Sequence, residues 1–154
     1  MEGDDPFCRI ARGEEPAYFV YEDDDLMVIL DHMPARFAHS LVVTKGHYAA
    51  VEDVPPRLLA KAWLVASALA RYLRREAGAV GVNVITNSGA PARQVVFHFH
   101  VHVIPHWPGE PEPHRHPLTK DEAEKALQLL SGSARLIKEY LDSLEADAMW
   151  AAKT

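Results

Sequence analysis

Three short runs of β-branched, aliphatic and aromatic residues dominate the first part of the chain. They cover residues 18–21, Leu26–Leu30 and Ser40–Thr44. An acidic stretch at 22–25 separates the first run from the second, and a proline-containing stretch at 33–36 precedes the third. Short apolar runs separated by polar, turn-forming residues are typical of strands joined by tight connections, which pair antiparallel. The pattern therefore predicts an antiparallel meander.

The next part of the chain changes from helical to strand periodicity. Apolar residues recur every three or four positions from 54 to about 77, which predicts an amphipathic helix. Strand-like runs follow at 81–86 and 95–104, with a polar loop at 87–92 between them. We expect Pro105 to stop the second of these strands, because proline cannot donate to a sheet.

A second helical pattern covers residues 119–145. Thr119 and Glu122 have the spacing of a capping box, which marks its start. We expect residues 131–133, Ser-Gly-Ser, to bend or divide it, and Trp150 beyond it is a candidate for packing against a neighbouring surface. The whole pattern predicts one α+β domain over residues 1–154, with an antiparallel sheet of about five strands, a central helix and a C-terminal helix.

The composition limits the partners and the cellular setting. The 154 residues include 16 Lys+Arg and 22 Asp+Glu, which gives a formal net charge of −6. This acidic balance argues against non-specific binding to nucleic acid. The N-terminal residues are acidic, and no apolar run approaches the ~20 residues of a membrane span. Cys8 is the single cysteine, so an intrachain disulfide is excluded. We expect a cytoplasmic protein without nucleic-acid or membrane partners.

Three of the nine histidines alternate within the predicted strand 95–104: His98, His100 and His102. Successive side chains of a strand point to opposite faces, so we expect these three to share one face. The opposite face would then carry four apolar residues suited to the core, namely Phe97, Phe99, Val101 and Val103.

Three explanations of this histidine row compete. Histidines on a solvated face need no partners, but their alternation is then unexplained. Alternating imidazoles on a strand can also bind a metal ion such as zinc. In the third explanation, one neutral imidazole attacks phosphorus without needing a base, a second protonates the leaving group, and a third orients the nucleophile. We favour the third.

The string His98-Phe99-His100-Val101-His102-Val103-Ile104 resembles a known signature, His-φ-His-φ-His-φ-φ with φ apolar. It belongs to the histidine-triad (HIT) family of nucleotide hydrolases and transferases. Other segments resemble the family in order and spacing, so that the resemblance covers about residues 7–108. It implies a HIT-like fold with its core there and a helical extension at about 119–146. Residues 105–110 show a weaker likeness to a branch associated with diadenosine polyphosphates.

The resemblance implies roles for four histidines. His100, in the middle of the triad, would be the nucleophile and would carry a nucleotidyl-histidine intermediate. His102 would lie near the departing group and help it to leave. His98 would fix the tautomer and orientation of His100, largely through its backbone carbonyl. His39 matches a further family histidine that supports the triad.

The resemblance also implies a nucleotide-binding set. Asp31 matches an acidic residue that accepts hydrogen bonds from the ribose hydroxyls, a task that suits a carboxylate. Leu30 and Leu41 match the apolar wall around the base. Asn87 and Gln94 match polar residues near the phosphate.

The chain departs from the family pattern beside the phosphate. Val95 stands where a serine or threonine hydroxyl is common, and Arg93 replaces a usual glycine. Phosphate contact would then shift from a hydroxyl to a guanidinium, which binds anionic oxygens well. We therefore count Arg93 among the nucleotide-binding residues and expect it to favour a more highly charged polyphosphate.

The family chemistry requires no cofactor, and we predict no metal ligand. Some bacterial relatives hold a structural zinc between a Cys-x-x-Cys pair and two histidines, which here correspond to His47 and His98. This chain has Asp5 in place of the first cysteine and keeps only Cys8. A mixed site of this kind binds zinc more weakly, so we do not expect a structural zinc.

The resemblance implies a homodimeric enzyme that acts on a purine nucleotide. It would cleave at the α-phosphate of an adenosine-type phosphoramidate, adenylylated amine or diadenosine polyphosphate. Two alternatives stay open: a dedicated diadenosine polyphosphate hydrolase or phosphorylase, and a nucleotide-binding interaction protein with weak residual activity. A metal-dependent hydrolase would differ from all of these by losing activity in chelator.

Overall fold

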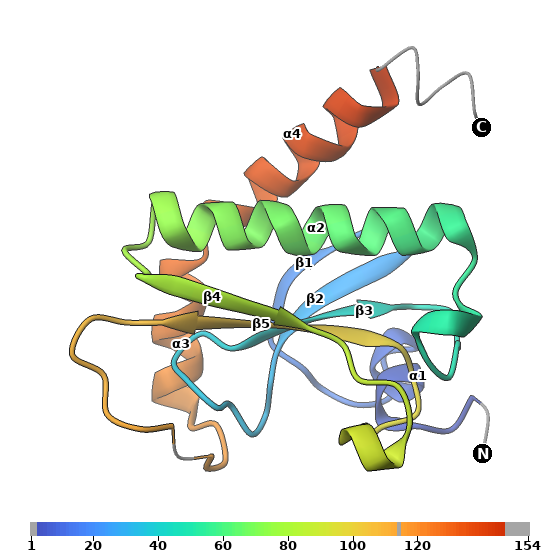
Figure 1. The fold of residues 1–154 in the computed structure, drawn as a ribbon, viewed down its shortest axis with the longest axis horizontal. Helices are drawn as coiled ribbons and strands as arrows, with labels where there is room; N and C mark the ends of the chain where they lie inside the picture. The colour runs from blue at the N-terminus through green and yellow to red at the C-terminus, as the bar shows by residue number, and fades with distance from the viewer. Residues whose placement is uncertain (1–2, 114, 147–154) are drawn as a thin grey trace.

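A computed structural model describes residues 3–113 and 115–146, which form a five-stranded antiparallel sheet with helices on both sides (Figure 1). The order of strands across the sheet is β1-β2-β3-β5-β4, so β1 and β4 lie at its edges. The predicted α+β fold and the meander of the first three strands are confirmed. The strands are β1 Phe19–Glu22, β2 Leu26–Leu30, β3 Ser40–Thr44, β4 Gly81–Ile85 and β5 His100–His106.

Alternating strand positions supply two separate apolar clusters, one on each face of the sheet. Helix α2, Pro56–Arg75, lies along one face and closes the larger cluster (Figure 1). Helix α1, Pro6–Ala11, contributes Phe7 to the smaller cluster on the other face. The strand residues of the larger cluster are Leu26, Val28, Leu30, Val42, Val101 and Val103, and those of the smaller one are Met27, Ile29, Leu41 and Val43.

Helix α1 was not predicted, although the sequence contains its start signal. Asp5 is the N-cap, and its Oδ1 accepts a hydrogen bond from the backbone N–H of Cys8 at 2.9 Å. Pro6 occupies the first helical position. A proline is tolerated there because the first N–H groups of a helix have no acceptor within the helix. A helix of 6 residues is too short to show a hydrophobic period in the sequence.

The C-terminal helical region is divided in two, at the place the sequence indicates. Helix α3 spans Lys120–Leu129 and helix α4 spans Ser133–Ala146. The capping box is present, since Thr119 Oγ1 accepts from the N–H of Glu122 and the Glu122 carboxylate accepts from the N–H of Thr119, both at 3.1 Å. Ile137 of α4 is buried in the larger cluster, the one that α2 covers. The prediction for Trp150 lies outside the described residues.

The predicted strand 95–104 is wrong at both ends. Residues 95–99 are irregular, and the N–H of Phe99 bonds to the carbonyl of Tyr48 at 2.6 Å. Phe97, expected in the core, is 49% exposed. At the other end β5 continues through Pro105, because β3 pairs with it only as far as Val103 and leaves Pro105 a single neighbouring strand, β4. An edge position of this kind tolerates a missing N–H.

Across residues 3–113 and 115–146, none of the helices combines the length and the apolar character that crossing a membrane would need.

Candidate active site

The catalytic candidates lie on the face of the sheet opposite α2. Antiparallel pairing places His100 opposite Val43 and His102 opposite Leu41. The centroids of the His100 and His102 rings are 5.0 Å apart, and the ring of Phe7 meets that of His100 edge-on at 5.0 Å. The sheet therefore provides a rigid apolar floor beneath two neighbouring imidazoles.

His98 precedes β5 and contributes through its backbone. Nδ1 of His100 lies 2.7 Å from the carbonyl oxygen of His98. A carbonyl can only accept, so the His100 proton is on Nδ1 and the lone pair is on Nε2. This hydrogen bond fixes both the tautomer and the orientation of His100 and leaves Nε2 available as a nucleophile.

A second chain of hydrogen bonds fixes the tautomer of His102. The N–H of Ala35 donates to Nδ1 of His39 at 3.0 Å, so the neutral His39 ring carries its proton on Nε2. His39 Nε2 lies 3.0 Å from Nδ1 of His102 and donates to it. His102 in turn carries its proton on Nε2. His102 therefore offers a hydrogen-bond donor next to the lone pair of His100. Both lie on the face of the sheet opposite α2, which we call the triad face.

Burial keeps the three rings uncharged. Desolvation is the largest cause that lowers the pKa of His39, to about 3. The next is repulsion between a protonated His39 and the positive charges that His102, Arg115 and His100 carry when protonated. Desolvation and the His100 and Arg115 charges lower the pKa of His102 to about 4. Burial also lowers the pKa of His100, although the carbonyl of His98 opposes the shift. At neutral pH all three are neutral imidazoles, which the nucleophile requires.

Asp31 lies at the end of β2, beside the start of β3. Its backbone N–H bonds to the carbonyl of His39 at 3.0 Å, and its Oδ1 accepts from the N–H of Met33 at 2.9 Å. Its Oδ2 lies 3.4 Å from His39 Nε2. The carboxylate thus lies at one end of the His39–His102 chain, where only 8% of its side chain is exposed.

The loop between β4 and β5 borders the other side of the triad. Gln94 is buried and both ends of its amide bind backbone, since Oε1 accepts from Gly89 at 2.8 Å and Nε2 donates to Ala49 at 2.6 Å. Asn87 donates to the carbonyl of Arg93 at 3.4 Å. Thr86 Oγ1 donates to the carbonyl of His100 at 2.7 Å. Gln94 therefore shapes this loop, while its role toward a phosphate stays a prediction.

Arg93 adopts a left-handed backbone conformation with φ of 73°. Glycine adopts this conformation without cost, whereas an arginine is strained in it. This conformation fits the glycine that is usual at the position in the family, and Arg93 is exposed on the loop between β4 and β5.

The two leucines predicted to form the base wall lie on opposite faces. Leu41 belongs to the smaller apolar cluster, on the face that carries His100 and His102. Leu30 belongs to the larger cluster, which α2 covers. The alternation of β2 places Ile29, not Leu30, on the triad face. Leu41 therefore shares its face of the sheet with Ile29 and Phe7 and not with Leu30.

The structure adds Arg115, which the sequence did not single out. The guanidinium lies 3.7 Å from Asp31 Oδ2 and donates to the carbonyl of Met33 at 2.6 Å. Arg115 lies in a proline-rich segment with no periodicity, so its proximity to Asp31, more than 80 residues away, depends on the tertiary fold.

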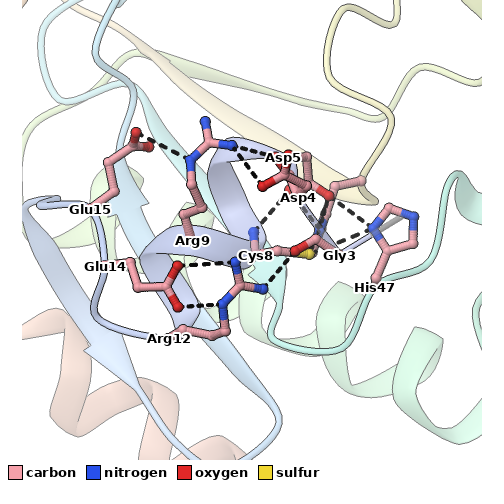
Figure 2. Close-up of polar contacts among 10 residues, drawn as sticks. Gly3, Asp4, Asp5, Cys8, Arg9, Arg12, Glu14, Glu15 and His47 are labelled. Atoms are coloured by element: carbon pink, nitrogen blue, oxygen red, sulfur yellow. Dashed lines mark hydrogen bonds and ion pairs between the residues drawn. The ribbon is translucent and has the colours of Figure 1, made fainter. Parts of the chain in front are cut away.

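A second polar cluster lies behind His98 and consists of Asp5, Cys8, His47 and His98. Figure 2 shows Asp5 and Cys8, at the start of α1, facing the ring of His47. Cys8 Sγ is 3.6 Å from His47 Nδ1 and 3.4 Å from His98 Nδ1, and Asp5 Oδ2 is 2.8 Å from His47 Nδ1. Burial and the neighbouring Asp5 raise the pKa of the Cys8 thiol to about 11. Burial opposes ionisation of Asp5, but hydrogen bonds from Cys8 and the charge of His98 outweigh it and hold the Asp5 pKa well below its usual range.

This cluster brings together donor atoms of the kinds that zinc binds. Its four donor atoms all lie within 4.8 Å of one another. In a tetrahedral zinc site with bonds of about 2.0–2.3 Å the donors are separated by similar distances. Nε2 of His98 donates to the carbonyl of Thr44 at 2.6 Å, so the neutral form of the ring carries its lone pair on Nδ1, the nitrogen that faces the cluster and would bind a metal in place of a proton. The residues present therefore fit a zinc ion.

Comparison with known proteins agrees with this geometry. The HIT domain profile matches residues 12–109. The adenylylsulfatase HINT3 of Arabidopsis thaliana is 36% identical over 137 residues, which cover 85% of this chain and 68% of that protein.

Two solved structures are similar over most of their length. A hypothetical histidine triad nucleotide-binding protein from Sulfolobus tokodaii is 32% identical with a TM-score of 0.77, covering 86% of this chain and 93% of that one. A zinc-bound histidine triad family protein from Mycobacterium smegmatis is 34% identical with a TM-score of 0.75, covering 91% and 96%. The alternating histidines on β5, the five-stranded sheet and the match over residues 12–109 place this chain in the histidine-triad family.

Proposed function

We propose that this protein is a nucleotide hydrolase or transferase that cleaves at the α-phosphate of a purine nucleotide through a covalent intermediate on His100. The observation that carries the proposal is the 2.7 Å hydrogen bond from His100 Nδ1 to the carbonyl of His98. It directs a neutral, unprotonated Nε2 outward from the sheet, which is the state a histidine nucleophile needs.

In the first step, the lone pair of His100 Nε2 attacks the α-phosphorus. A P–N bond forms and the bond from phosphorus to the leaving group breaks, which leaves a nucleotidyl group on a positively charged imidazole. The carbonyl of His98 faces the Nδ1–H of this ring and stabilises the developing charge without reorganising. The departing group takes the electron pair of the broken bond and a proton from solvent. Water or another acceptor then attacks the same phosphorus and releases a proton to solvent, while the electron pair of the P–N bond returns to Nε2 and His100 is neutral again.

His102 acts on the leaving group as a hydrogen-bond donor and does not transfer a proton to it. With its pKa at about 4 it is uncharged at neutral pH, so it cannot act as an imidazolium acid. Its Nε2–H, directed by His39, is a donor for the bridging or departing atom as negative charge develops there. This refines the expectation that a second imidazole protonates the leaving group.

The leaving group is the open part of the proposal. The candidates are an amine, as in a phosphoramidate or adenylylated amine, and a phosphate chain, as in a diadenosine polyphosphate. The Arabidopsis relative is an adenylylsulfatase, so sulfate is a further candidate for the leaving group. Among these, the charge of Arg93, which the resemblance assigns to phosphate contact, favours the more highly charged polyphosphates.

We propose that catalysis needs no cofactor and that the Asp5–Cys8–His47–His98 cluster is structural. A zinc ion there would tie α1 to the base of β5 and so support the backbone that orients His100. Replacement of one cysteine by Asp5 weakens such a site relative to a two-cysteine one.

We propose that the protein is a homodimer paired through β4. This strand lies at an edge of the sheet, and unpaired edge strands are prone to pair with another chain. Ile85 at its end is 40% exposed and lies opposite His102 in register, on the triad face. Pairing there would continue the sheet, as the resemblance implies, and cover this apolar side chain.

Replacement of the nucleophile gives the most direct test of the reaction. We expect His100→Asn to lower kcat/KM by at least ~10⁴-fold, and His102→Asn by ~10²–10³-fold, because the first removes the covalent route and the second one hydrogen-bond donor. Adenosine 5′-phosphoramidate, adenylyl sulfate and diadenosine tetraphosphate are offered together in EDTA, with and without phosphate, and products are separated by chromatography.

The products of this assay assign the leaving group. AMP from the phosphoramidate indicates a phosphoramidase, preferential loss of the tetraphosphate indicates the polyphosphate branch, and ADP formed only with phosphate indicates a phosphorylase. Full activity in His100→Asn contradicts the covalent mechanism. Binding without turnover of any substrate would favour a nucleotide-binding interaction protein.

The pH dependence of the reaction follows from the lowered pKa values. Because burial depresses the histidine pKa values, the neutral rings persist below the usual pKa of 6.5. We expect the acid-side inflection of kcat/KM to lie below 6.5, because burial lowers the pKa of the His100 nucleophile from its usual value. An inflection at or above 6.5, with the thermal midpoint unchanged over the same range, contradicts the neutral-histidine assignment.

Metal content tests the weakened zinc site. We expect the purified protein to hold well under one zinc per chain after dialysis against EDTA, and Asp5→Cys to retain about one, because a second thiolate strengthens the site. Inductively coupled plasma mass spectrometry measures the zinc. The matched variant Cys8→Ala lacks the thiolate and should hold no zinc after the same dialysis. Retention of one zinc per chain by the unaltered protein overturns the expectation.

Size-exclusion chromatography with light scattering tests the dimer. We expect the mass of two chains for the natural sequence and of one chain for Ile85→Arg, because a charge at this edge is incompatible with pairing. Phe19→Arg places the same charge on an exposed apolar residue of the opposite edge strand, β1, and should stay dimeric. A monomeric natural protein contradicts the proposal.

A further inference from the structure

The segment that follows β5 folds back onto the loop between β2 and β3. We call residues 107–113 and 115–118 the covering segment. Before residue 115 it is held by an ion pair between Glu110 and Arg36 and by a bond from Trp107 Nε1 to the carbonyl of Phe37 at 2.9 Å. After it, the N–H of Leu118 bonds to the carbonyl of His32 at 2.8 Å. Contacts on both sides therefore fix Arg115 relative to the β2–β3 loop.

This anchoring places a cation against the carboxylate expected to bind the ribose. The guanidinium of Arg115 is 3.7 Å from Asp31 Oδ2 and donates a hydrogen bond to the carbonyl of Met33 at 2.6 Å. The Arg115 side chain is 49% exposed. Arginine has five N–H donors in a fixed fork, so it retains donors for an outside ligand.

A second donor flanks the same carboxylate. His32 follows Asp31 in the chain, its Nδ1 is 3.9 Å from Asp31 Oδ1, and its side chain is 90% exposed. Arg115 and His32 thus approach different oxygens of the Asp31 carboxylate, and both side chains are exposed to solvent.

Neutral ribose hydroxyls do not call for such an arrangement. A hydroxyl that donates to Asp31 needs an acceptor only, and the carboxylate already supplies it. A guanidinium binds two oxygens of a phosphate, and its charge also offsets the repulsion between a phosphate and Asp31. In dinucleotide-binding folds, a carboxylate reads the free ribose hydroxyl and a nearby arginine accommodates a phosphate on it.

Resting on the function proposed above, we propose that Arg115 and His32 bind a phosphate on the 2′- or 3′-oxygen of the ribose. The substrate class of this site is then a purine nucleotide that is phosphorylated on its ribose as well as at its 5′ position. Asp31 retains the hydroxyl that stays free.

Isothermal titration calorimetry with three nucleotides tests this directly, without relying on turnover. AMP, adenosine 3′,5′-bisphosphate and adenosine 2′,5′-bisphosphate differ only in the ribose phosphate, and the two bisphosphates separate the two positions. We expect one bisphosphate to bind the natural protein about 10-fold or more tighter than AMP, as a charged, bidentate contact provides.

The arginine variants identify the residue responsible. We expect the ratio of the two dissociation constants to fall toward one in Arg115→Gln and to recover in part in Arg115→Lys, which restores the charge but not the fork. Arg135→Gln, an exposed arginine of α4 paired with Glu139, is the matched control and should keep the ratio of the natural protein.

Each remaining outcome separates this inference from the proposed function. If AMP binds and neither bisphosphate binds more tightly, the ribose-phosphate inference fails and the proposed function stands. If Arg115→Gln weakens AMP and the bisphosphates equally, Arg115 only braces Asp31 and the inference fails. If none of the three nucleotides binds the natural protein, both fail.

Discussion

The antiparallel pairing of β3 with β5 is the constraint on which the rest of the site depends. It sets His100 opposite Val43 and His102 opposite Leu41, which gives both imidazoles a common apolar floor. It also brings the start of β3 beside β5, so that His39 reaches Nδ1 of His102. Because a shift of one residue in this register would turn the histidines to the α2 side, the buried alternation of both strands is what holds the chemistry in place.

Backbone groups control the protonation of this site more than side-chain charges do. The carbonyl of His98 sets the tautomer of His100, and the N–H of Ala35 sets that of His39 and through it that of His102. Burial lowers the pKa of each ring, so none competes for a proton at neutral pH. The outcome is a lone pair on one ring and a hydrogen-bond donor on the next, a combination suited to attack on phosphorus and to stabilising a departing group.

Two loosely patterned parts of the chain complete the arrangement. The start of α1 joins Cys8 and Asp5 to His98 and His47, behind the nucleophile. The covering segment after β5 brings Arg115 to Asp31 at the other end. Both are short or proline-rich, so neither carries a hydrophobic period, and their positions depend on contacts with residues distant in sequence. A site built on a rigid sheet is thus adjusted by loops, which is where specificity commonly resides.

The sequence by itself determined the α+β class, the exact bounds of β2 and β3, the long central helix and the division of the C-terminal one. It also indicated the triad, because the alternation of its histidines is local information: the strand puts His100 and His102 on one face, while His98 lies just before it. Only the tertiary structure decided that β5 begins at His100, that Phe97 is exposed and that Ile29, not Leu30, shares a face with Leu41. Those outcomes depend on where β3 and β4 stop pairing with β5 and on which face α2 covers. Periodicity records which residues alternate, but packing between distant segments decides which side is buried and what each side chain meets.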